Sequence, residues 1–447
     1  MPLKVAIIGS GISGLAAAHA LSAQGGAVQL TLLEAGAYYG GHANTVDITL
    51  PTPQGPVTHG VDTGFLVLNE RTYPNLIGLL KQLGVASAKS EMSFSVQSER
   101  AAGQTPLEWG GSNLASLFAQ RSNLFSPRFW GMLKDLLRFN ALCTHIAEQG
   151  TEQQLSQTLG DFLCEQRFGD AFCEDYLLPM MACIWSCPTR QMLAFPVATM
   201  LRFCHNHGLL QITGRPQWYT VQGGSKHYVE KIVAGIADKR LNTPVHRIKR
   251  LSGPSGGVML SLDSGTERFD KVIIATHSDQ ALALLAEPTA AERSTLGKIR
   301  YQSNKAVLHT DASVLPRHQA AWAAWNYERS AVQTEGAKGA EATEQRVCLH
   351  YYLNRLQPLP WTQPVLVSLN PLRPIDPTKV LGEFDYAHPV LDLAAVAAQA
   401  RMPHLQGWEH CYFAGAWMGY GFHEDGLKAG QAAAKQLLHD CAVAVYA

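Results

Sequence analysis

The chain opens with a short apolar run, a glycine-rich turn and a helical pattern. Val5–Ile8 is continuously apolar, as expected of a strand buried on both faces. The next segment, 9–14, is rich in glycine, and Ala and Leu then recur at helical spacing to about Gln24. A second apolar run follows at Val28–Leu33. This order of strand, turn, helix and strand predicts the βαβ start of a parallel sheet.

The glycine turn has the spacing of a dinucleotide-binding motif. Gly9, Gly11 and Gly14 form G-x-G-x-x-G between the first strand and the helix. In this motif the first glycine makes the tight turn, the second lets the backbone approach a pyrophosphate, and the third lets the helix pack on the sheet. Glu34 lies twenty residues beyond Gly14, where an acceptor for ribose hydroxyls is needed. The unit predicts bound FAD or NAD(P), with the diphosphate at the helix start.

A second glycine pair distinguishes between these cofactors. Gly40 and Gly41 follow the ribose acid closely and precede His42. The segment resembles the second glycine motif of the flavin amine oxidase and phytoene desaturase superfamily, which NAD enzymes lack. The resemblance implies FAD, and it places His42 near the flavin and the diphosphate, where the family usually has a basic residue. A pair that only turns the chain is the alternative.

Later segments continue the resemblance. Two stretches between 222 and 276 resemble the returning strands that embrace the adenosine half of FAD. Residues 412–430 resemble the C-terminal strand and helix start that close over the flavin, where the helix dipole favours negative charge on the reduced ring. Ala416 stands where the family usually has an acid. Contacts there are therefore expected from backbone amides or from the cluster at 423–425.

The resemblance becomes closer in five segments. They look like the flavin-binding half fused in front of plant cyclopropane fatty acid synthases, and like its stand-alone bacterial relatives. This resemblance implies FAD and a link to cyclopropane, branched or furan-containing fatty acids of membrane lipids. The methyltransferase half is not present in this chain. The segments are 184–188, 204–207, 214–218, 321–326 and 415–430.

The superfamily implies a fold that combines α/β and α+β parts. We expect a flavin amine oxidase-like architecture, in which a Rossmann-like FAD-binding domain carries an inserted substrate domain of mixed sheet and helical cap. The FAD-binding domain is expected at 1–70, 215–280 and 405–447, and the substrate domain at 71–214 and 281–404. Within the latter, the polar, aperiodic residues 331–345 predict a mobile surface loop.

Composition narrows the partners and the compartment. Lys and Arg number 36 and Asp and Glu also 36, which argues against nucleic acid because phosphate binding needs surplus positive charge. The nine cysteines include no C-x-x-C pair and read as free thiols of a reducing compartment. Neither a secretory signal nor a membrane-spanning run is evident, so we expect a cytoplasmic protein, with peripheral attachment to the inner face of the membrane if the substrate is a lipid.

Two stretches in the middle of the chain can each be interpreted in two ways. Residues 114–140 mix bulky apolar side chains with four basic residues and one acid, which suits a membrane-surface segment or a cap helix with an inward apolar stripe. Aromatic and methionine residues at 171–219 and 320–352 suit a tunnel around an acyl chain or ordinary core packing. His205 and His207 lack an accompanying ligand set, so no metal is expected.

The expected function follows from the cofactor. We expect an FAD-dependent oxidoreductase, a desaturase or oxidase, that transfers hydride to flavin N5 from an unsaturated, methyl-branched or cyclopropane-type fatty acyl chain, free or in phospholipid. One alternative is a flavin-containing amine oxidase. A second is a non-catalytic flavoprotein partner of a cyclopropane synthase-type methyltransferase, and a third is a carotenoid-type desaturase.

The candidate catalytic residues are His42, Lys305, His423 and Glu424. Lys305 sits where flavin amine oxidases often place a lysine that holds a water at flavin N5, and the other three are candidate bases. The expected cofactor contacts are Gly9, Gly11, Ile12, Ser13, Gly14, Glu34, Ala35, Gly40, Gly41, His42, Val245, Thr276, Gly415, Ala416, Phe422, His423 and Glu424.

Overall fold

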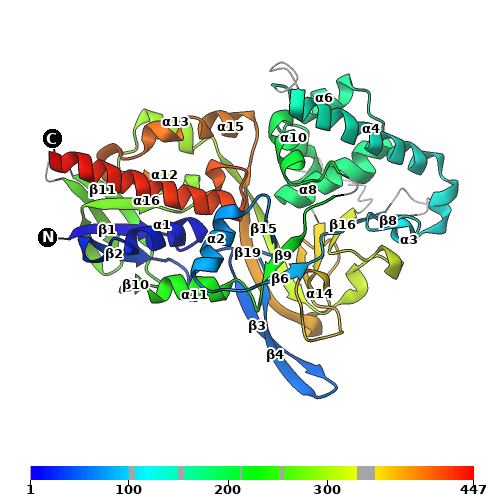
Figure 1. The fold of residues 1–447 in the computed structure, drawn as a ribbon, viewed down its shortest axis with the longest axis horizontal. Coiled ribbons are helices and arrows are strands. Elements are labelled where there is room, and N and C mark those ends of the chain that lie inside the picture. Colours follow the sequence, from blue (N-terminus) through cyan, green and yellow to red (C-terminus); the bar gives the residue numbers. More distant parts are fainter. Residues whose placement is uncertain are drawn as a thin grey trace, which may run out of the picture.

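A computed structural model describes residues 2–99, 106–149, 156–211, 214–251, 256–329 and 348–446, with side chains to residue 442. The loop expected at 331–345 lies outside these residues. Figure 1 shows the two chain ends on one side of the molecule, beside helices α1 and α16, and the helices α4, α6, α8 and α10 on the other side. All nine cysteines are free, as expected.

A five-stranded parallel sheet carries the N-terminal βαβ unit. Its strand order is β10-β2-β1-β14-β20, and every neighbouring pair is parallel. The strands are buried at their centres, as their apolar runs predicted; in β1, Val5, Ala6 and Ile7 have no exposed surface. The bounds are β1 Leu3–Ile8, α1 Ile12–Ser22, β2 Val28–Leu33, β10 Asp238–Arg240, β14 Lys271–Ile274 and β20 Cys411–Phe413.

Helix α16, His423–Tyr446, lies along α1. Small residues allow this close approach: a Cβ added to Gly430 would overlap the carbonyl oxygen of Ser13, and one added to Gly14 would overlap that of Gly9. Gly14 therefore packs the helix on the turn, the role that its place in the motif predicted. The packing aims the start of α16 at the same edge of the sheet as the start of α1.

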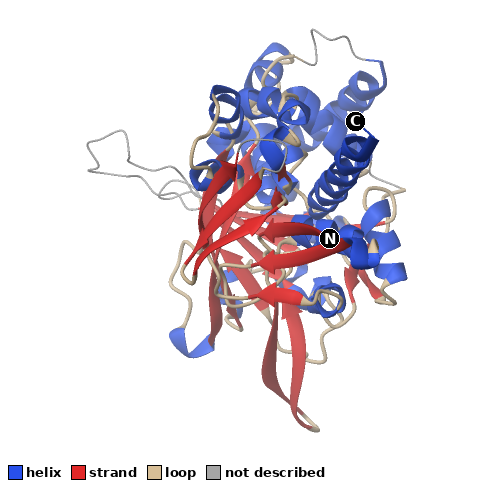
Figure 2. Cartoon of the chain, turned by 90° about the vertical axis from the view of Figure 1, so that its left-hand side faces the viewer, coloured by secondary structure: helices blue, strands red, loops and turns tan. Residues whose placement is uncertain are grey.

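Smaller elements flank this sheet. Strands β11, β12 and β13 form an antiparallel sheet, and β5, β9 and β6 form another. The β3–β4 hairpin projects from the end of the molecule opposite the cap helices (Figure 2). The bounds are β3 Thr45–Thr52, β4 Gly55–Asp62, β5 Leu68–Asn69, α2 Pro74–Gln82, β6 Ser87–Ser90, β9 Trp218–Val221, α11 Lys226–Ala234, β11 Val245–Leu251, β12 Gly257–Leu262, β13 Gly265–Phe269, α12 Ser278–Leu284, α13 Ala290–Leu296 and α15 Leu393–Gln399.

A seven-stranded mixed sheet forms the second large layer. Its order is β19-β15-β18-β17-β16-β7-β8, with β16 and β7 parallel and the other pairs antiparallel. The bounds are β7 Phe94–Ser98, β8 Leu107–Gly110, β15 Arg300–His309, β16 Trp325–Arg329, β17 Cys348–Tyr352, α14 Leu353–Leu356, β18 Leu366–Leu369 and β19 Val380–Val390.

A group of helices covers one end of this sheet. Their bounds are α3 Leu114–Leu117, α4 Pro127–Gln149, α6 Leu159–Glu165, α7 Asp170–Phe172, α8 Leu178–Trp185, α9 Thr189–Met192 and α10 Val197–Asn206. The parallel nucleotide-binding sheet, the mixed sheet and the helical cap confirm the expected fold class. The exact domain boundaries stay a proposal. Within the described ranges, no helix combines the length and apolar character that crossing a bilayer requires.

Candidate active site

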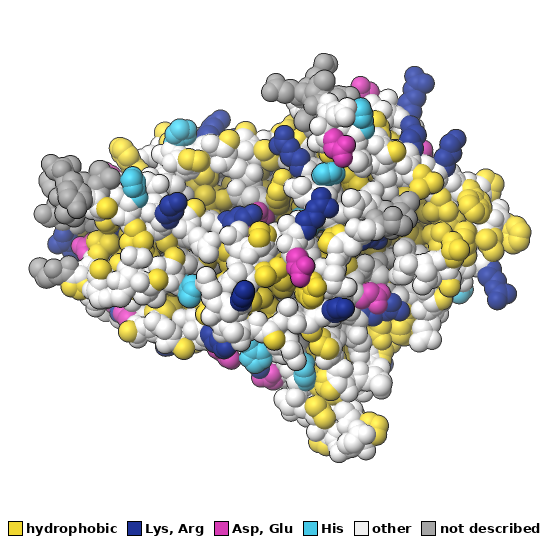
Figure 3. All heavy atoms as spheres, viewed as in Figure 1, with side chains coloured by type: hydrophobic (Ala, Val, Ile, Leu, Met, Phe, Trp, Pro, Cys, Tyr) yellow, Lys and Arg dark blue, Asp and Glu magenta, His cyan; other side chains and the backbone are white. Residues whose placement is uncertain are grey.

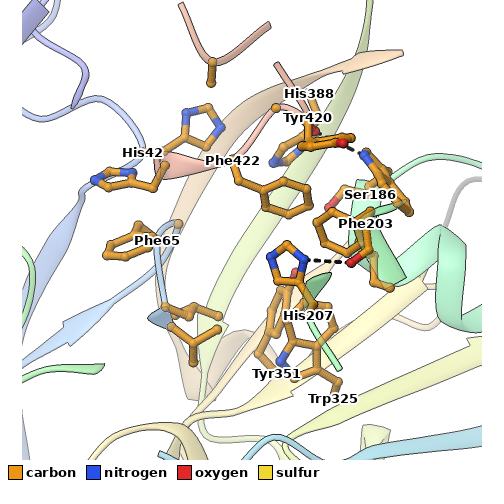
Figure 4. A pocket seen from close by; sticks show the side chains of 18 of the residues that line it. His42, Phe65, Ser186, Phe203, His207, Trp325, Tyr351, His388, Tyr420 and Phe422 are labelled. Atoms are coloured by element: carbon orange, nitrogen blue, oxygen red, sulfur yellow. Dashed lines mark hydrogen bonds between the residues drawn. The ribbon is translucent and has the colours of Figure 1, made fainter. Parts of the chain in front are cut away.

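A cavity of about 2000 Å³ lies where the parallel sheet, the mixed sheet and the cap helices meet. Its wall includes the turns at the carboxyl ends of β1, β2 and β14, the start of α16, and side chains of α4, α8, α10, β16 and β17. Ligand sites of single small molecules measure roughly 300–1,000 Å³. The cavity therefore has room for a large cofactor and a second molecule. Figure 4 shows the aromatic and histidine side chains that face it.

The glycine turn forms an open cradle at one end of the cavity. Gly9 has φ of +96°, a conformation that favours glycine, and makes the turn. Gly11 caps α1 and lines the cavity, and a Cβ added there would meet no atom within 4 Å. The space beside Gly11 is thus free for a ligand, and the first amides of α1 can donate to an anion there.

Glu34 and the second glycine pair close the cradle. The Glu34 carboxylate accepts hydrogen bonds from the Ser10 amide (2.8 Å), the Ser10 hydroxyl (2.6 Å) and the Gly36 amide (2.8 Å). These bonds fix the carboxylate at the cavity wall, and its remaining lone pairs can accept ribose hydroxyls. Gly40 donates its amide to the Ser10 carbonyl at 3.0 Å, so the pair packs directly on the first turn.

The arrangement fits an FAD molecule. The open space at Gly11 leaves the amides of α1 available to the diphosphate, and the fixed carboxylate of Glu34 can accept hydrogen bonds from the ribose. The start of α16 lies at the cavity, where its helix dipole favours negative charge on the flavin. The expected cofactor residues that line the cavity are Gly9, Gly11, Ile12, Ser13, Glu34, Ala35, Gly40, Gly41, His42, Val245, Thr276, Gly415, Ala416, Phe422 and His423.

The Glu424 side chain does not face the cavity, so the structure does not place its carboxylate where a base or cofactor contact was expected. Its carboxylate accepts hydrogen bonds from the Asn75 amide and side chain (3.0 and 2.6 Å) and from the Leu76 amide (3.0 Å). Those amides are the first of α2, so Glu424 caps that helix. Asp425 likewise turns back and accepts from the Phe422 amide at 3.0 Å. Burial raises the pKa of Asp425 to about 6.

Lys305 also lies outside the cavity, which makes its expected place beside the flavin wrong. Its Nζ pairs with Glu383 on the neighbouring strand β19 at 2.6 Å, and half of its side chain is exposed. Side chains alternate along a strand, so the preceding residue, Asn304, points inward and is buried. Its Nδ2 donates to Nδ1 of His388 at 3.0 Å. Asn304 and His388 therefore occupy the inner position where a lysine was expected.

His42 and His388 face the cavity together (Figure 4). Their ring centroids are 5.2 Å apart, and His42 also stacks on Tyr386 at 4.8 Å. Burial and the neighbouring His388 lower the pKa of His42 well below its ordinary value, and its Nε2 has no hydrogen-bond partner among the described residues. Burial lowers the pKa of His388 to about 4. Both rings are neutral at pH 7.

His423 begins α16 and lines the cavity, as expected, but its Nε2 is engaged. The Tyr228 hydroxyl lies 2.6 Å from this atom, and the ring stacks on Phe65 at 3.9 Å. Burial lowers the pKa of His423 to about 3. Of the two expected histidine bases, His42 thus has the ring nitrogen without a partner in the described ranges, although this atom is itself buried. Sequence reasoning missed His388, and the alternation of β15 and β19 was the only signal for it.

The far part of the cavity is aromatic. Phe203, Trp325, Tyr351 and Tyr420 face it, with His207 between them (Figure 4). Nδ1 of His207 lies 2.9 Å from the Phe203 carbonyl, and burial lowers the pKa of this ring to about 4. His207 is therefore a neutral wall residue of this cavity.

One buried cluster was not expected from the sequence. Glu328, Cys348 and His350 lie on β16 and β17, and their ligand-type atoms lie within 4.8 Å of one another. His350 Nε2 is 2.9 Å from Glu328, whose other oxygen pairs with Arg373 at 3.0 Å. Burial raises the pKa of the Cys348 thiol. The three groups satisfy one another by hydrogen bonds, and the guanidinium supplies the positive charge that a metal would otherwise bring.

The fold and the cradle define a two-layered, dinucleotide-binding protein with an inserted substrate layer. The chain belongs to the flavin-containing amine oxidoreductase family, whose sequence pattern matches residues 12–355. FAD is the cofactor of this family, and the cradle fits it.

Three further comparisons place the chain among known proteins. It is 28% identical over 301 residues to carotenoid phi-ring synthase of Streptomyces griseus. The aligned region covers 63% of this chain and 54% of that protein. The chain thus matches about half the length of this relative. Cyclohexylamine oxidase of Brevibacterium oxydans shares the fold with a TM-score of 0.67, 18% identity and coverage of 99% and 100% of the two chains. A fatty acid isomerase of P. acnes shares it with a TM-score of 0.61, 15% identity and coverage of 97% and 98%.

Proposed function

We propose that the protein oxidises a long acyl chain, unsaturated, methyl-branched or cyclopropane-bearing, as a desaturase or oxidase. The observation that supports this substrate is the continuity of the cavity from the FAD cradle, through the aromatic region around Phe203 and Tyr351, to the cap helices α3 and α4. An acyl chain is held by apolar contact area, which this lining offers over its length. The likeness to a protein named carotenoid phi-ring synthase, a name that denotes a long apolar molecule, supports the same class.

The charges of the lining favour an apolar substrate over a cation. Among the described residues that line the cavity, the carboxylates are Glu34 and Glu91. Glu34 is fixed in the cofactor cradle, and Glu91 pairs with Arg355 at 2.7 Å. Neither is placed to receive a substrate ammonium group in the aromatic region.

The residues beside the cradle suit a reaction that removes hydrogen from carbon. When bound, FAD supplies the acceptor for the hydride and its two electrons, and an external acceptor such as O2 restores the oxidised cofactor. His42 is the candidate base for the proton that leaves the adjacent carbon, so that a new double bond forms. Its Nε2 has no partner in the described part of the chain but is covered by protein, so the ring must turn to reach the substrate. His388, fixed by Asn304, keeps its proton on Nε2 and can donate it to a polar group in the cavity.

An anaerobic titration tests the proposal. Flavin absorbance at about 450 nm is followed while phospholipids with unsaturated or methyl-branched chains are added, and then a panel of amines. Bleaching by the lipids supports acyl oxidation. Bleaching by amines alone overturns it and favours an amine oxidase. No bleaching by either class favours a non-catalytic flavoprotein that assists a cyclopropane synthase-type methyltransferase.

Amine oxidation is the second candidate, and the aromatic region is the observation that favours it. Phe203 and Phe422 stack at 4.8 Å, with Tyr420 beside Phe203 at 5.9 Å. Such rings can hold an ammonium group by cation–π attraction. The two candidates differ in one variant: Phe203→Leu removes a ring face of the aromatic region but keeps apolar area, so it impairs amine turnover strongly and acyl turnover weakly.

A further inference from the structure

An apolar surface is exposed at the end of the helical cap. We call this surface the apolar rim and define it by five residues of α3, α4 and the turn between them. Phe125 is 86% exposed and Leu114 is 75% exposed, and large apolar side chains gathered on a surface in this way often mark an interaction site. Figure 3 shows the side chains gathered at the right-hand end of the molecule, with basic groups around them. The rim consists of Leu114, Leu124, Phe125, Trp130 and Leu137.

Helix α4 has two apolar faces, and only one of them packs inward. Phe129, Met132 and Phe139 are buried against the cap. Trp130 and Leu137 lie on the outer face, and half of each side chain is exposed. The inward stripe of the stretch 114–140 agrees with the interpretation as a cap helix, and the second apolar stripe is left exposed on the outer face.

The rim is held in place, so its exposure is a fixed feature of the fold. Nε1 of Trp130 donates to the Leu124 carbonyl at 3.0 Å, and the indole packs on Phe118 at 5.7 Å. Asn113 caps α3 by accepting from the Ser116 amide at 2.9 Å. These bonds fix the turn that carries Phe125 at its tip.

The charge beside the rim favours an anionic surface. Between residues 112 and 139 the chain has four basic residues and one acid. Arg128 pairs with Glu174 and Asp175, whereas Arg121 and Lys134 are exposed and make no ion pair within the described part of the chain. Two free cations thus lie beside five exposed apolar side chains. That combination matches a bilayer with anionic headgroups.

The cavity reaches the surface at the rim. Leu114, Trp130 and Leu137 are exposed and also line the cavity, together with Leu133 and Lys134. A chain that left the bilayer at this point would enter the aromatic region without crossing water.

We propose that the apolar rim docks on an anionic phospholipid bilayer and that the cavity takes an acyl chain directly from it. The route of the acyl chain rests on the proposed function, whereas docking itself is independent of turnover. Phe125 and Leu124 insert among the acyl chains near the headgroups, and Arg121 and Lys134 contact the headgroup phosphates.

Vesicle flotation of the FAD-loaded protein tests docking. The vesicles are phosphatidylcholine with about 30% phosphatidylglycerol, and pure phosphatidylcholine vesicles serve as the comparison. The double variant Leu124→Ser, Phe125→Ser removes apolar area at positions that do not line the cavity. We expect its partition onto anionic vesicles to fall about tenfold or more. Arg121→Glu should lower partition onto the anionic vesicles alone.

The matched control is Leu393→Ser, Trp408→Ser, which removes two exposed apolar side chains far from the rim along the chain. We expect this control to float like the unaltered protein, and all variants to keep their bound FAD and melting temperature. Docking would be overturned if the unaltered protein does not float or if the rim variant floats normally. It would also be overturned if the rim variant changes only the association of two copies of the chain and not the partition onto vesicles.

The same proteins separate the two proposals. If detergent-dispersed lipids bleach the flavin but the protein does not float, docking is wrong and acyl oxidation stands. If the protein floats by its rim but no lipid bleaches the flavin, docking stands and the proposed function is wrong.

Discussion

Replacing Gly11 by Val should weaken FAD binding strongly without destabilising the apoprotein. Gly11 has φ of −63° and ψ of 176°, values that Val adopts without strain. The position where a Cβ would stand has no neighbour within 4 Å and faces the cavity. A side chain there meets the ligand rather than the protein.

The magnitude follows from the contacts that the ligand would lose. Hydrogen bonds from amides to a charged group contribute about 1.5–3 kcal/mol each. If the Val methyl groups displace the diphosphate from two amides at the start of α1, binding weakens by about 3–6 kcal/mol, or roughly 10²- to 10⁴-fold. The free energy of unfolding of the apoprotein should change by no more than about 1 kcal/mol, because the restricted unfolded chain offsets any loss at the helix cap.

Two measurements on the apoprotein separate these effects. FAD titration gives the Kd, and thermal unfolding with and without FAD gives the stability and its increase on binding. Gly14→Ala is the contrasting control, because its Cβ would overlap the carbonyl oxygen of Gly9 and should lower the melting temperature of the apoprotein itself. A Gly11→Val protein that binds FAD within about threefold of normal, or that melts as early as Gly14→Ala, would refute the reasoning.

Three other predictions follow from the same contacts. Glu34→Ala should weaken FAD binding less than Gly11→Val does, because it removes an acceptor and leaves the cradle open; an equal loss in FAD titration would contradict this. Lys305→Met should leave the rate of anaerobic flavin reduction within about twofold, since its ammonium pairs outside the cavity; a large loss would return the residue to the site. Burial lowers the pKa of His207 and His388 to about 4 and that of His423 to about 3, from 6.5. Below pH 6.5 the unfolded chain therefore binds more protons than the folded chain. Denaturant titrations should show the free energy of unfolding falling toward pH 4 by up to about 1.4 kcal/mol per pH unit for each ring. A free energy of unfolding that does not change with pH would contradict the lowered pKa values.

The cofactor half could be predicted because its signals are local. The spacing from Gly9 to Glu34 sets the strand, turn and helix, and the second glycine pair lies close to them in the chain. Each of these residues depends mainly on its own turn and the adjacent strand. The structure accordingly places them in one cradle.

The catalytic half could not be predicted in the same way because its geometry depends on distant partners. Asn304 and Lys305 are adjacent in the chain, and the pairing of β15 with β19 decides which of the two side chains faces inward. Glu424 lies in the expected helix turn, yet α2, some 350 residues earlier in the chain, takes its carboxylate. His388 had no motif, and only the folded sheet brings it beside His42.

The stretch 114–140 shows a third kind of limit. Its composition admitted an inward stripe and a surface stripe, and a hydrophobic pattern cannot tell which of two apolar faces will be covered. The fold buries Phe129 and leaves Trp130 half exposed, although the two residues are adjacent.

The mass of the product after a single anaerobic turnover tests the central claim most directly. The FAD-loaded protein is mixed with an excess of phospholipid that has unsaturated or methyl-branched chains, and the lipids are then extracted and weighed by mass spectrometry. The proposed reaction predicts an acyl chain two hydrogens lighter, in an amount equal to the flavin that is reduced. Lipids of unchanged mass beside a flavin that amines alone reduce would contradict acyl oxidation and assign the cavity to an amine.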